Sequence, residues 1–294
     1  MDLLKRAEEK KVLLAAHRGV CGGNIPCNSL QAFQAAVLAG ADVVELDVER
    51  TADRELFIQH PGFEHVHLRM ADSIKNHPAW EVEGFRLSNQ DHAETQYRIP
   101  RLVQALELLR GKCFVNIDKF WENPKEIAEL VHALGMEEQV IIKTDAAPAN
   151  LEAVERYAPD IPFMAIIGDN PEIHEELMNR KLRYIGAEVL FEREDKPTAS
   201  PEFVERVHRD GKLLWANAIV YDYRAVLTAG HNDDISVTED PEKGWGWLAD
   251  RGFDLIQTDF IYPCRIFLEK TGRRNKSYAS DRVFKGISAS IFTA

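Results

Sequence analysis

The amino-acid sequence predicts an α/β fold, a (β/α)8 TIM barrel, from three observations. Eight short apolar, β-branched runs alternate with longer amphipathic stretches along a chain of 294 residues. The runs are almost continuously hydrophobic, which is typical of parallel strands covered on both faces. One such barrel takes about 250 residues, so the chain has room for additions. An open doubly wound sheet is the rival fold, but no GxGxxG motif follows the first run.

The strands and helices follow from this alternation. Several of the predicted helices begin with Pro in the first turn or end at Gly, which is the usual asymmetry of helix ends. We expect strands at residues 11–17, 42–48, 113–118, 139–144, 162–168, 183–191, 212–219 and 253–259. We expect helices between them, including residues 29–39, 99–110, 124–134, 171–181 and 201–209.

Two insertions interrupt the rhythm of strands and helices. Residues 61–98 come after the second strand unit, and residues 221–246 separate the seventh and eighth strands. Both follow the C-terminal ends of strands, where TIM barrels build their active sites. We therefore predict a single domain over residues 1–268, with both insertions on the active-site face, and a C-terminal extension over residues 269–294.

Composition excludes several classes of protein. A net charge of −12 disfavours binding to nucleic acid or to anionic membrane surfaces. No apolar run approaches about 18 residues, so no membrane insertion is expected. The N-terminal stretch interrupts its apolar residues with charges, unlike a signal peptide. The sequence as it stands predicts a cytoplasmic protein, or a secreted or periplasmic one if a signal peptide has been removed. The oligomeric state is left open.

The second predicted strand, within "VVELDVER" (43–50), carries two acids on one face. Residues i and i+2 of a strand point to the same side, so Glu45 and Asp47 project together. Two unpaired carboxylates in an apolar strand repel each other and are costly to desolvate. A divalent cation removes both costs, and oxygen ligands suit magnesium or calcium (Mg2+ or Ca2+) better than zinc. Pairing of the acids with Arg or Lys is the alternative.

Other polar residues stand at the ends of predicted strands. His17 and Arg18 end the first strand, His60 follows a short apolar run, and the pair Asp118 and Lys119 ends the third strand. In a barrel all of them converge on one mouth. Two imidazoles, clustered carboxylates and two cations indicate a metal-assisted site acting on a phosphate. Arg can clamp two phosphate oxygens, and His has the pKa needed for acid–base catalysis.

Several motifs carry a family resemblance. "HRG", then "NIPCNSLQAFQAAVLAGADVVELDVERTADRELFIQH", "IPRLVQAL", "FVNIDK", "LLWANA" and "GFDLIQTD" span nearly the whole barrel. Together they resemble the glycerophosphodiester phosphodiesterase family. The resemblance implies hydrolysis of glycerophosphodiesters to glycerol 3-phosphate and an alcohol. It also implies that Glu45 and Asp47 bind one divalent cation, that His17 and His60 are the general acid and base, and that Arg18 binds phosphate.

The sequence departs from the family pattern at three positions. Asp118 stands where the family usually has a Glu as third metal ligand, Cys27 replaces a Glu that follows HRG, and Pro61 follows His60 in place of an Asp. These changes indicate an altered substrate pocket or reduced activity. Hydrolysis of a different phosphodiester, such as a sugar phosphodiester, and a barrel that binds phosphate without turnover are therefore the alternatives.

A last group of residues has less specific signals. Lys143 and Glu188, near the ends of the fourth and sixth strands, are each expected either to contact the bound phosphodiester or the metal shell, or to form a structural ion pair. Trp215 is expected either to line the pocket or to lie in the core. An acidic cluster in the second insertion (Asp233, Asp234, Glu239 and Asp240) lacks the central Gly of a calcium loop, so we expect a solvated loop.

Overall fold

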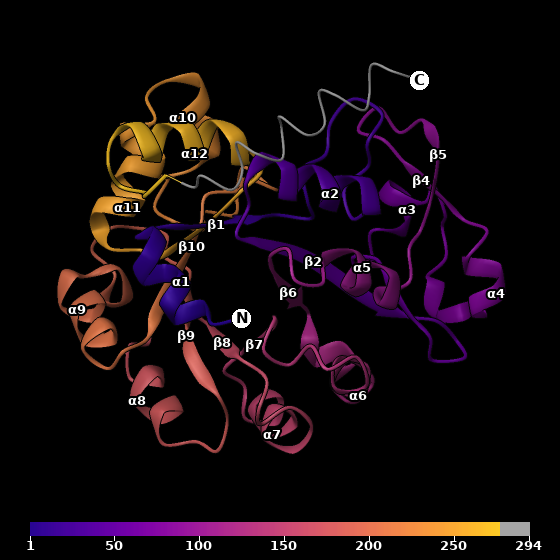
Figure 1. Cartoon of the computed structure of the whole chain (residues 1–294), viewed down its shortest axis with the longest axis horizontal. Coiled ribbons are helices and arrows are strands. Elements are labelled where there is room, and N and C mark those ends of the chain that lie inside the picture. Colours follow the sequence, from indigo (N-terminus) through magenta and orange to yellow (C-terminus); the bar gives the residue numbers. More distant parts are fainter. Residues whose placement is uncertain (277–294) are drawn as a thin grey trace.

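The computed structural model, which describes residues 1–276, contains a closed barrel of eight parallel strands surrounded by helices (Figure 1). Parallel pairing runs around the whole ring, and β1 closes it by pairing with both β2 and β11. The TIM-barrel prediction is therefore confirmed, and the doubly wound alternative is wrong. The barrel strands are β1 (Leu13–Ala16), β2 (Val43–Arg50), β6 (Phe114–Asp118), β7 (Val140–Asp145), β8 (Phe163–Ile167), β9 (Tyr184–Val189), β10 (Leu213–Asn217) and β11 (Leu255–Thr258).

Helices surround the barrel, and their ends follow the capping signals of the sequence. The Ser29 hydroxyl accepts a hydrogen bond from the amide of Ala32, and the Ser200 hydroxyl accepts one from the amide of Phe203. Such side-chain caps satisfy amides that have no partner inside the helix. The outer helices are α2 (Leu30–Ala39), α5 (Leu102–Leu109), α6 (Pro124–Ala133), α7 (Pro148–Tyr157), α8 (Ile173–Met178), α9 (Pro201–Arg209) and α12 (Ile261–Lys270).

Hydrophobic residues fill the barrel interior at its N-terminal end. The helix α1 (Leu3–Lys10) covers this end, because its Leu3 and Ala7 pack against the apolar residues of the inner strand faces. Toward the C-terminal ends the inner faces become polar, since Val43 is followed by Glu45 and Asp47 on β2. The outer faces pack against the helices in a second, larger core. This arrangement confines the polar groups of the barrel interior to one end.

The first insertion is a small subdomain. Strand β3 (Leu56–Ile58), just before the insertion, pairs antiparallel with the end of β2, and within the insertion β4 (Arg86–Ser88) forms a hairpin with β5 (Glu94–Arg98). Short helical segments lie between them, α3 (Glu64–His67), η1 (Ile74–Asn76) and α4 (Ala79–Val82). A separate apolar cluster holds them together, formed by Phe57, Leu68, Ile74, Ala79, Val82, Leu87 and Ile99.

The second insertion and the remaining short segments complete the described chain. The insertion contains α10 (Asp233–Thr238) and a π-helical turn η4 (Glu242–Gly246), which continues into α11 (Trp247–Arg251). The segments η2 (Phe120–Glu122) and η3 (Pro197–Ala199) precede α6 and α9. Among residues 1–276, no helix is both long enough and apolar enough to span a bilayer.

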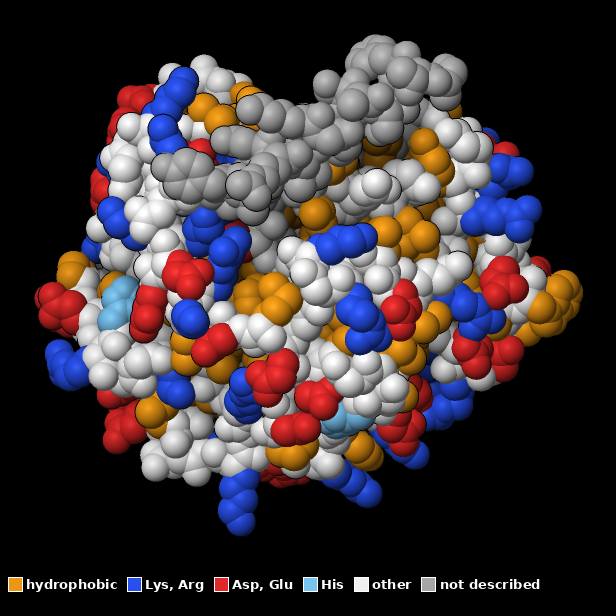
Figure 2. Space-filling model, in the orientation of Figure 1, with side chains coloured by type: hydrophobic (Ala, Val, Ile, Leu, Met, Phe, Trp, Pro, Cys, Tyr) orange, Lys and Arg blue, Asp and Glu red, His pale blue; other side chains and the backbone are white. Residues whose placement is uncertain are grey.

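The predicted C-terminal extension, residues 269–294, is described only as far as residue 276. Helix α12 runs two residues past the predicted domain boundary, to Lys270. Beyond it, Arg274 forms a buried ion pair with Asp42 at 2.7 Å, at the N-terminal end of the barrel. The remainder, residues 277–294, lies outside the described residues. On the face that carries α1, acidic and basic side chains are interspersed among the described residues (Figure 2).

Candidate active site

A cavity opens at the C-terminal ends of the barrel strands, and it collects most of the predicted site residues. His17 and Arg18 from the end of β1, the two acids of β2, Asp118 of β6 and Lys143 of β7 line it. The opposite wall comes from β8 to β11 and the second insertion, and consists of Ile166, Glu188, Leu190, Asn217, Ile219, Tyr221, Leu227 and Gln257. The predicted convergence on one mouth is therefore observed for these residues.

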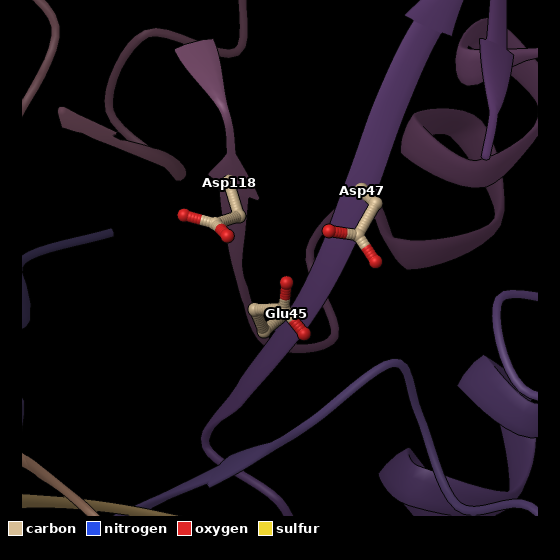
Figure 3. A group of neighbouring side chains, drawn as sticks. All are labelled: Glu45, Asp47 and Asp118. Atoms are coloured by element: carbon tan, nitrogen blue, oxygen red, sulfur yellow. The ribbon is translucent and has the colours of Figure 1, made fainter. Parts of the chain in front are cut away.

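Three carboxylates meet on two neighbouring strands. Glu45 and Asp47 point from β2 toward Asp118 on β6 (Figure 3), and one oxygen of each lies within 4.8 Å of the other two. The register explains the grouping, because Asp47 pairs directly with Asp118 across the two parallel strands. Glu45 and Asp47 are almost fully buried. Such a set of hard oxygen donors fits a divalent cation, so these residues form a candidate metal site.

The Arg18 side chain and backbone hold the two buried acids of β2. Its amide donates to Oε2 of Glu45 at 2.8 Å, and its Nε pairs with Oδ2 of Asp47 at 2.9 Å. Oε1 of Glu45 and Oδ1 of Asp47 stay outside these contacts. The alternative of pairing with Arg is thus correct for Asp47, but one guanidinium leaves the cluster short of positive charge. Burial and the neighbouring Asp47 accordingly raise the pKa of Glu45 to about 7.

Asn28, which the sequence analysis did not select, is a further partner of this cluster. Its Nδ2 donates to Oδ2 of Asp47 at 2.9 Å. Burial alone would raise the pKa of Asp47, but Arg18, His60 and this hydrogen bond outweigh it and lower the pKa. Arg18, Asn28 and Lys119 all have a positive φ, between 53° and 55°. Backbone strain of this kind gathers at functional sites.

The two predicted imidazoles have the same ring nitrogen, Nδ1, engaged with another group of the protein. Nδ1 of His17 lies 2.9 Å from Oδ1 of Asp259, and Nδ1 of His60 lies 2.9 Å from the carbonyl oxygen of Pro61. A carboxylate and a carbonyl only accept hydrogen bonds, so Nδ1 is the donor in both rings and Nε2 is left available. His60 does not line the cavity itself, and its ring packs against Phe63 with centroids 4.2 Å apart.

The pKa values of these imidazoles shift in opposite directions. For His17, burial lowers the pKa, but the hydrogen bond to Asp259 and the charge of Glu45 outweigh burial and raise it. For His60, burial lowers the pKa, and the charge of Asp47 only partly offsets this effect. The charges of Arg18 and Lys119 lower the pKa of His60 further.

The remaining predicted binding residues are already engaged with other protein groups. Lys143 forms an ion pair with Glu188 at 2.5 Å, and both residues also line the cavity. Trp215 is fully buried and does not line the cavity, and its ring lies 3.7 Å from Nζ of Lys143. The core alternative therefore fits Trp215. Nζ of Lys119 lies 3.6 Å from Oδ2 of Asp118, at the edge of the site.

Two of the other sequence interpretations have a clear outcome. Cys27 contacts Nε2 of His67 through its sulfur at 3.5 Å, and burial raises the pKa of this thiol to about 12. It therefore adds no charge where the family usually has a Glu. Within the acidic cluster of the second insertion, the solvated interpretation is wrong for Asp233, which is buried because the Trp245 side chain and the end of β11 cover it.

The sequence matches known proteins along most of its length. It matches the glycerophosphoryl diester phosphodiesterase family over residues 17–261. It is 29% identical over 245 residues to a glycerophosphodiester phosphodiesterase of Caldanaerobacter subterraneus subsp. tengcongensis, covering 79% of this chain and 96% of that protein. A protein of the same name from Bacillus altitudinis is 30% identical over 138 residues, which span 44% of this chain and only 56% of the relative.

Solved structures share the fold at lower identity. A glycerophosphoryl diester phosphodiesterase from Parabacteroides distasonis has a TM-score of 0.72 at 20% identity, with 92% of this chain and 93% of that one covered. An Oleispira antarctica phosphodiesterase, solved in complex with the product sn-glycerol-3-phosphate, has a TM-score of 0.60 at 19% identity, with 87% and 95% covered. At these identities the similarity establishes the barrel fold.

Proposed function

The chain belongs to the glycerophosphoryl diester phosphodiesterase family, and from this membership we propose that it hydrolyses glycerophosphodiesters to glycerol 3-phosphate and an alcohol. The observation that carries the proposal is the gathering of Glu45, Asp47 and Asp118 beside Arg18 and two imidazoles with available Nε2 atoms. The complex of the Oleispira antarctica relative with glycerol 3-phosphate supports the same product.

One divalent cation, Mg2+ or Ca2+, is the proposed cofactor. Glu45, Asp47 and Asp118 would hold it, and the buried position of the first two fits, because their charges are only partly compensated by Arg18. When bound, the cation neutralises negative charge that develops on the phosphate oxygens. Asp118 is one methylene shorter than the Glu usual in the family, and its register beside Asp47 brings its carboxylate within reach of the other two.

The side chains supply the remaining chemistry. Arg18, fixed by Asp47 and by its own backbone, binds the phosphate and offsets its charge. A hydroxyl of the substrate next to the phosphate attacks phosphorus, and one imidazole accepts the proton of this hydroxyl at Nε2. The other imidazole, protonated, donates a proton to the departing alkoxide. The cyclic phosphate is then opened by water with the two roles exchanged. His17 and His60 are the proposed acid and base, without an order between them.

A sugar phosphodiester is the second candidate substrate. The observation in its favour is the polar wall opposite the acids, where Glu188, Asn217 and Gln257 line the cavity. Carboxylate and amide groups bind hydroxyls well, and a sugar offers more of them than glycerol. Lys119 and Lys143 are proposed to contribute to phosphate binding through their charge. Trp215 contributes only indirectly, because its ring packs against Nζ of Lys143.

The test is an activity screen over glycerophosphodiesters and sugar phosphodiesters with Mg2+, with Ca2+ and with chelator. We expect cation-dependent release of glycerol 3-phosphate, which also excludes a barrel that only binds phosphate. Glu45→Gln and Asp47→Asn should each lower kcat/KM by more than the roughly 10–100-fold typical of residues that only support a metal ligand. Full activity of either variant in excess chelator would refute the metal site.

Glu49→Gln is the matched control. Glu49 lies on β2 two residues beyond Asp47, but its carboxylate pairs with Lys75 at 2.9 Å and does not line the cavity. This variant should keep the activity and its dependence on the cation.

A further inference from the structure

We propose that Asp259 is a positioning residue that sets the tautomer and orientation of His17, and that Asp233 of the second insertion holds Asp259 in place. The inference rests on the proposed function, in which His17 moves a proton. Neither Asp lines the cavity.

The contact between Asp259 and His17 determines which ring nitrogen faces the site. Asp259 follows β11, and its Oδ1 lies 2.9 Å from Nδ1 of His17. Because an ionised carboxylate only accepts, it keeps the ring proton on Nδ1 and leaves Nε2 of this cavity-lining residue available. The exposed imidazole of a free His exchanges between two tautomers. This contact selects the one that can accept a proton from a substrate.

The imidazole is also held from its backbone side. The amide of His17 donates to the carbonyl of Thr258, the residue before Asp259. The side chain and the backbone of His17 are therefore both hydrogen-bonded to the same turn, Thr258 and Asp259, at the end of β11. The conformation of that turn decides where the ring lies.

Asp233 fixes this turn with a full set of hydrogen bonds. Its Oδ2 accepts from the amide of Asp259 at 2.9 Å, and its Oδ1 accepts from Oγ1 of Thr258 at 2.6 Å and from Nε1 of Trp245 at 2.7 Å. Its own amide donates to the carbonyl of Ala218, at 2.7 Å, just past β10. Asp233 is 2% exposed, so loss of the bond from the Asp259 amide or of the bond to the Ala218 carbonyl would leave a buried polar group unsatisfied.

A continuous path of contacts therefore runs from the second insertion to the proposed proton-transfer residue. It passes from the first residue of α10, Asp233, to the backbone of Asp259, and from the Asp259 carboxylate to His17. During proton transfer the carboxylate stays ionised and the Nδ1 proton stays on the ring, while Nε2 gains or loses a proton. Asp233 thus acts on the reaction without itself lining the cavity.

The first test is the kinetics of Asp259→Asn in the full chain. The amide can rotate and present its NH2 to the ring, which favours the wrong tautomer. We expect kcat to fall by roughly 100- to 10,000-fold, as when an orienting carboxylate is removed from other imidazoles. KM and the cation dependence should change by less than about 3-fold, since Asp259 does not line the cavity. Asp259→Glu should recover part of kcat, because it restores an accepting carboxylate.

Asp160→Asn is the matched control. Asp160 pairs with His132 at 3.0 Å on the surface, in the same kind of contact but remote from the cavity. It should retain the parental kcat. A parental kcat in Asp259→Asn would overturn the proposal.

The second test does not depend on turnover, so it separates this inference from the proposed function. In protein labelled with 15N-histidine, the His17 signals are identified by their loss in His17→Gln. In the parental protein, neutral His17 should carry its proton on Nδ1, and Asp259→Asn should give a mixture of tautomers. Thr258→Val, which removes one donor to Asp233, should also populate the tautomer protonated at Nε2 while the chain stays folded. A proton on Nε2 of parental His17 would overturn the inference even if the enzyme is active.

Discussion

Substitution of the glycine in "HRG" tests how the site is built, because Gly19 has no room for a side chain. Its φ is +83°, and a Cβ there would lie 2.6 Å from the carbonyl carbon of Ala32 and 2.8 Å from its oxygen. Gly19→Ala therefore incurs about 1–2 kcal/mol for the left-handed backbone. The overlap with the backbone of α2 adds roughly 1–3 kcal/mol, as in overpacked cores. Alanine also restricts the unfolded chain more than glycine does, which offsets about 0.4–1 kcal/mol of this destabilisation.

The net expectation is a destabilisation of about 2–4 kcal/mol, measured as a lower urea midpoint with an unchanged slope. Activity should also fall, because relief of the overlap moves either α2 or the adjacent Arg18, which holds both buried acids. Gly23→Ala is the control: its φ is +55°, but a Cβ there meets nothing within 4 Å. If the two variants differ in stability by less than about 0.5 kcal/mol, the close approach to α2 does not matter and the reasoning fails.

Three further perturbations follow from buried or titrating pairs. Lys143→Met leaves Glu188 without its cation in the barrel interior and should lower the free energy of unfolding in urea by about 3 kcal/mol. The double variant with Glu188→Gln should recover most of this loss, and strictly additive losses would contradict a direct pair. Arg274→Ala breaks an ion pair whose side chains are both 1% exposed and should lower the free energy of unfolding by about 3–5 kcal/mol. A loss under about 1 kcal/mol, as for a surface pair, would mean that the C-terminal segment is dispensable for folding. The hydrogen bond to Asp254 raises the pKa of His208, so its stabilisation is present below the ordinary pKa and is lost as pH rises through the raised value. His208→Gln should thus lower Tm more at about pH 5.5 than at about pH 9, and equal losses would refute the pairing.

Local periodicity explains why much of the fold was predictable. Six of the eight barrel strands lie within the predicted runs, and β2 and β7 extend past them by two residues and one residue, because strands buried on both faces need uninterrupted apolar residues whatever the rest of the chain does. The same reasoning put Glu45 and Asp47 on one face of β2, since alternation along a strand is a property of the backbone alone. His17, Arg18 and Asp118 could be predicted at the mouth because parallel strands of a barrel all end on the same side.

Burial and partners were harder to predict, because they depend on segments distant in sequence. Trp215 could line a pocket or lie in the core, and only the packed barrel interior decides between them. Asp233 looked like one of several acids in a polar loop, yet Trp245 and Thr258 enclose it. Sequence composition around a residue does not report which segments fold over it.

Strand alternation and parallel topology are enough to predict a barrel with two acids, an arginine and a histidine directed at its C-terminal mouth. That Asp118 comes level with Asp47 follows from the register of β2 and β6 in the folded barrel. The contact of His17 with Asp259, 242 residues away in the chain, likewise exists only in the folded barrel. Contacts at such separations are set by how whole strands and insertions pack together, which no local pattern of residues encodes.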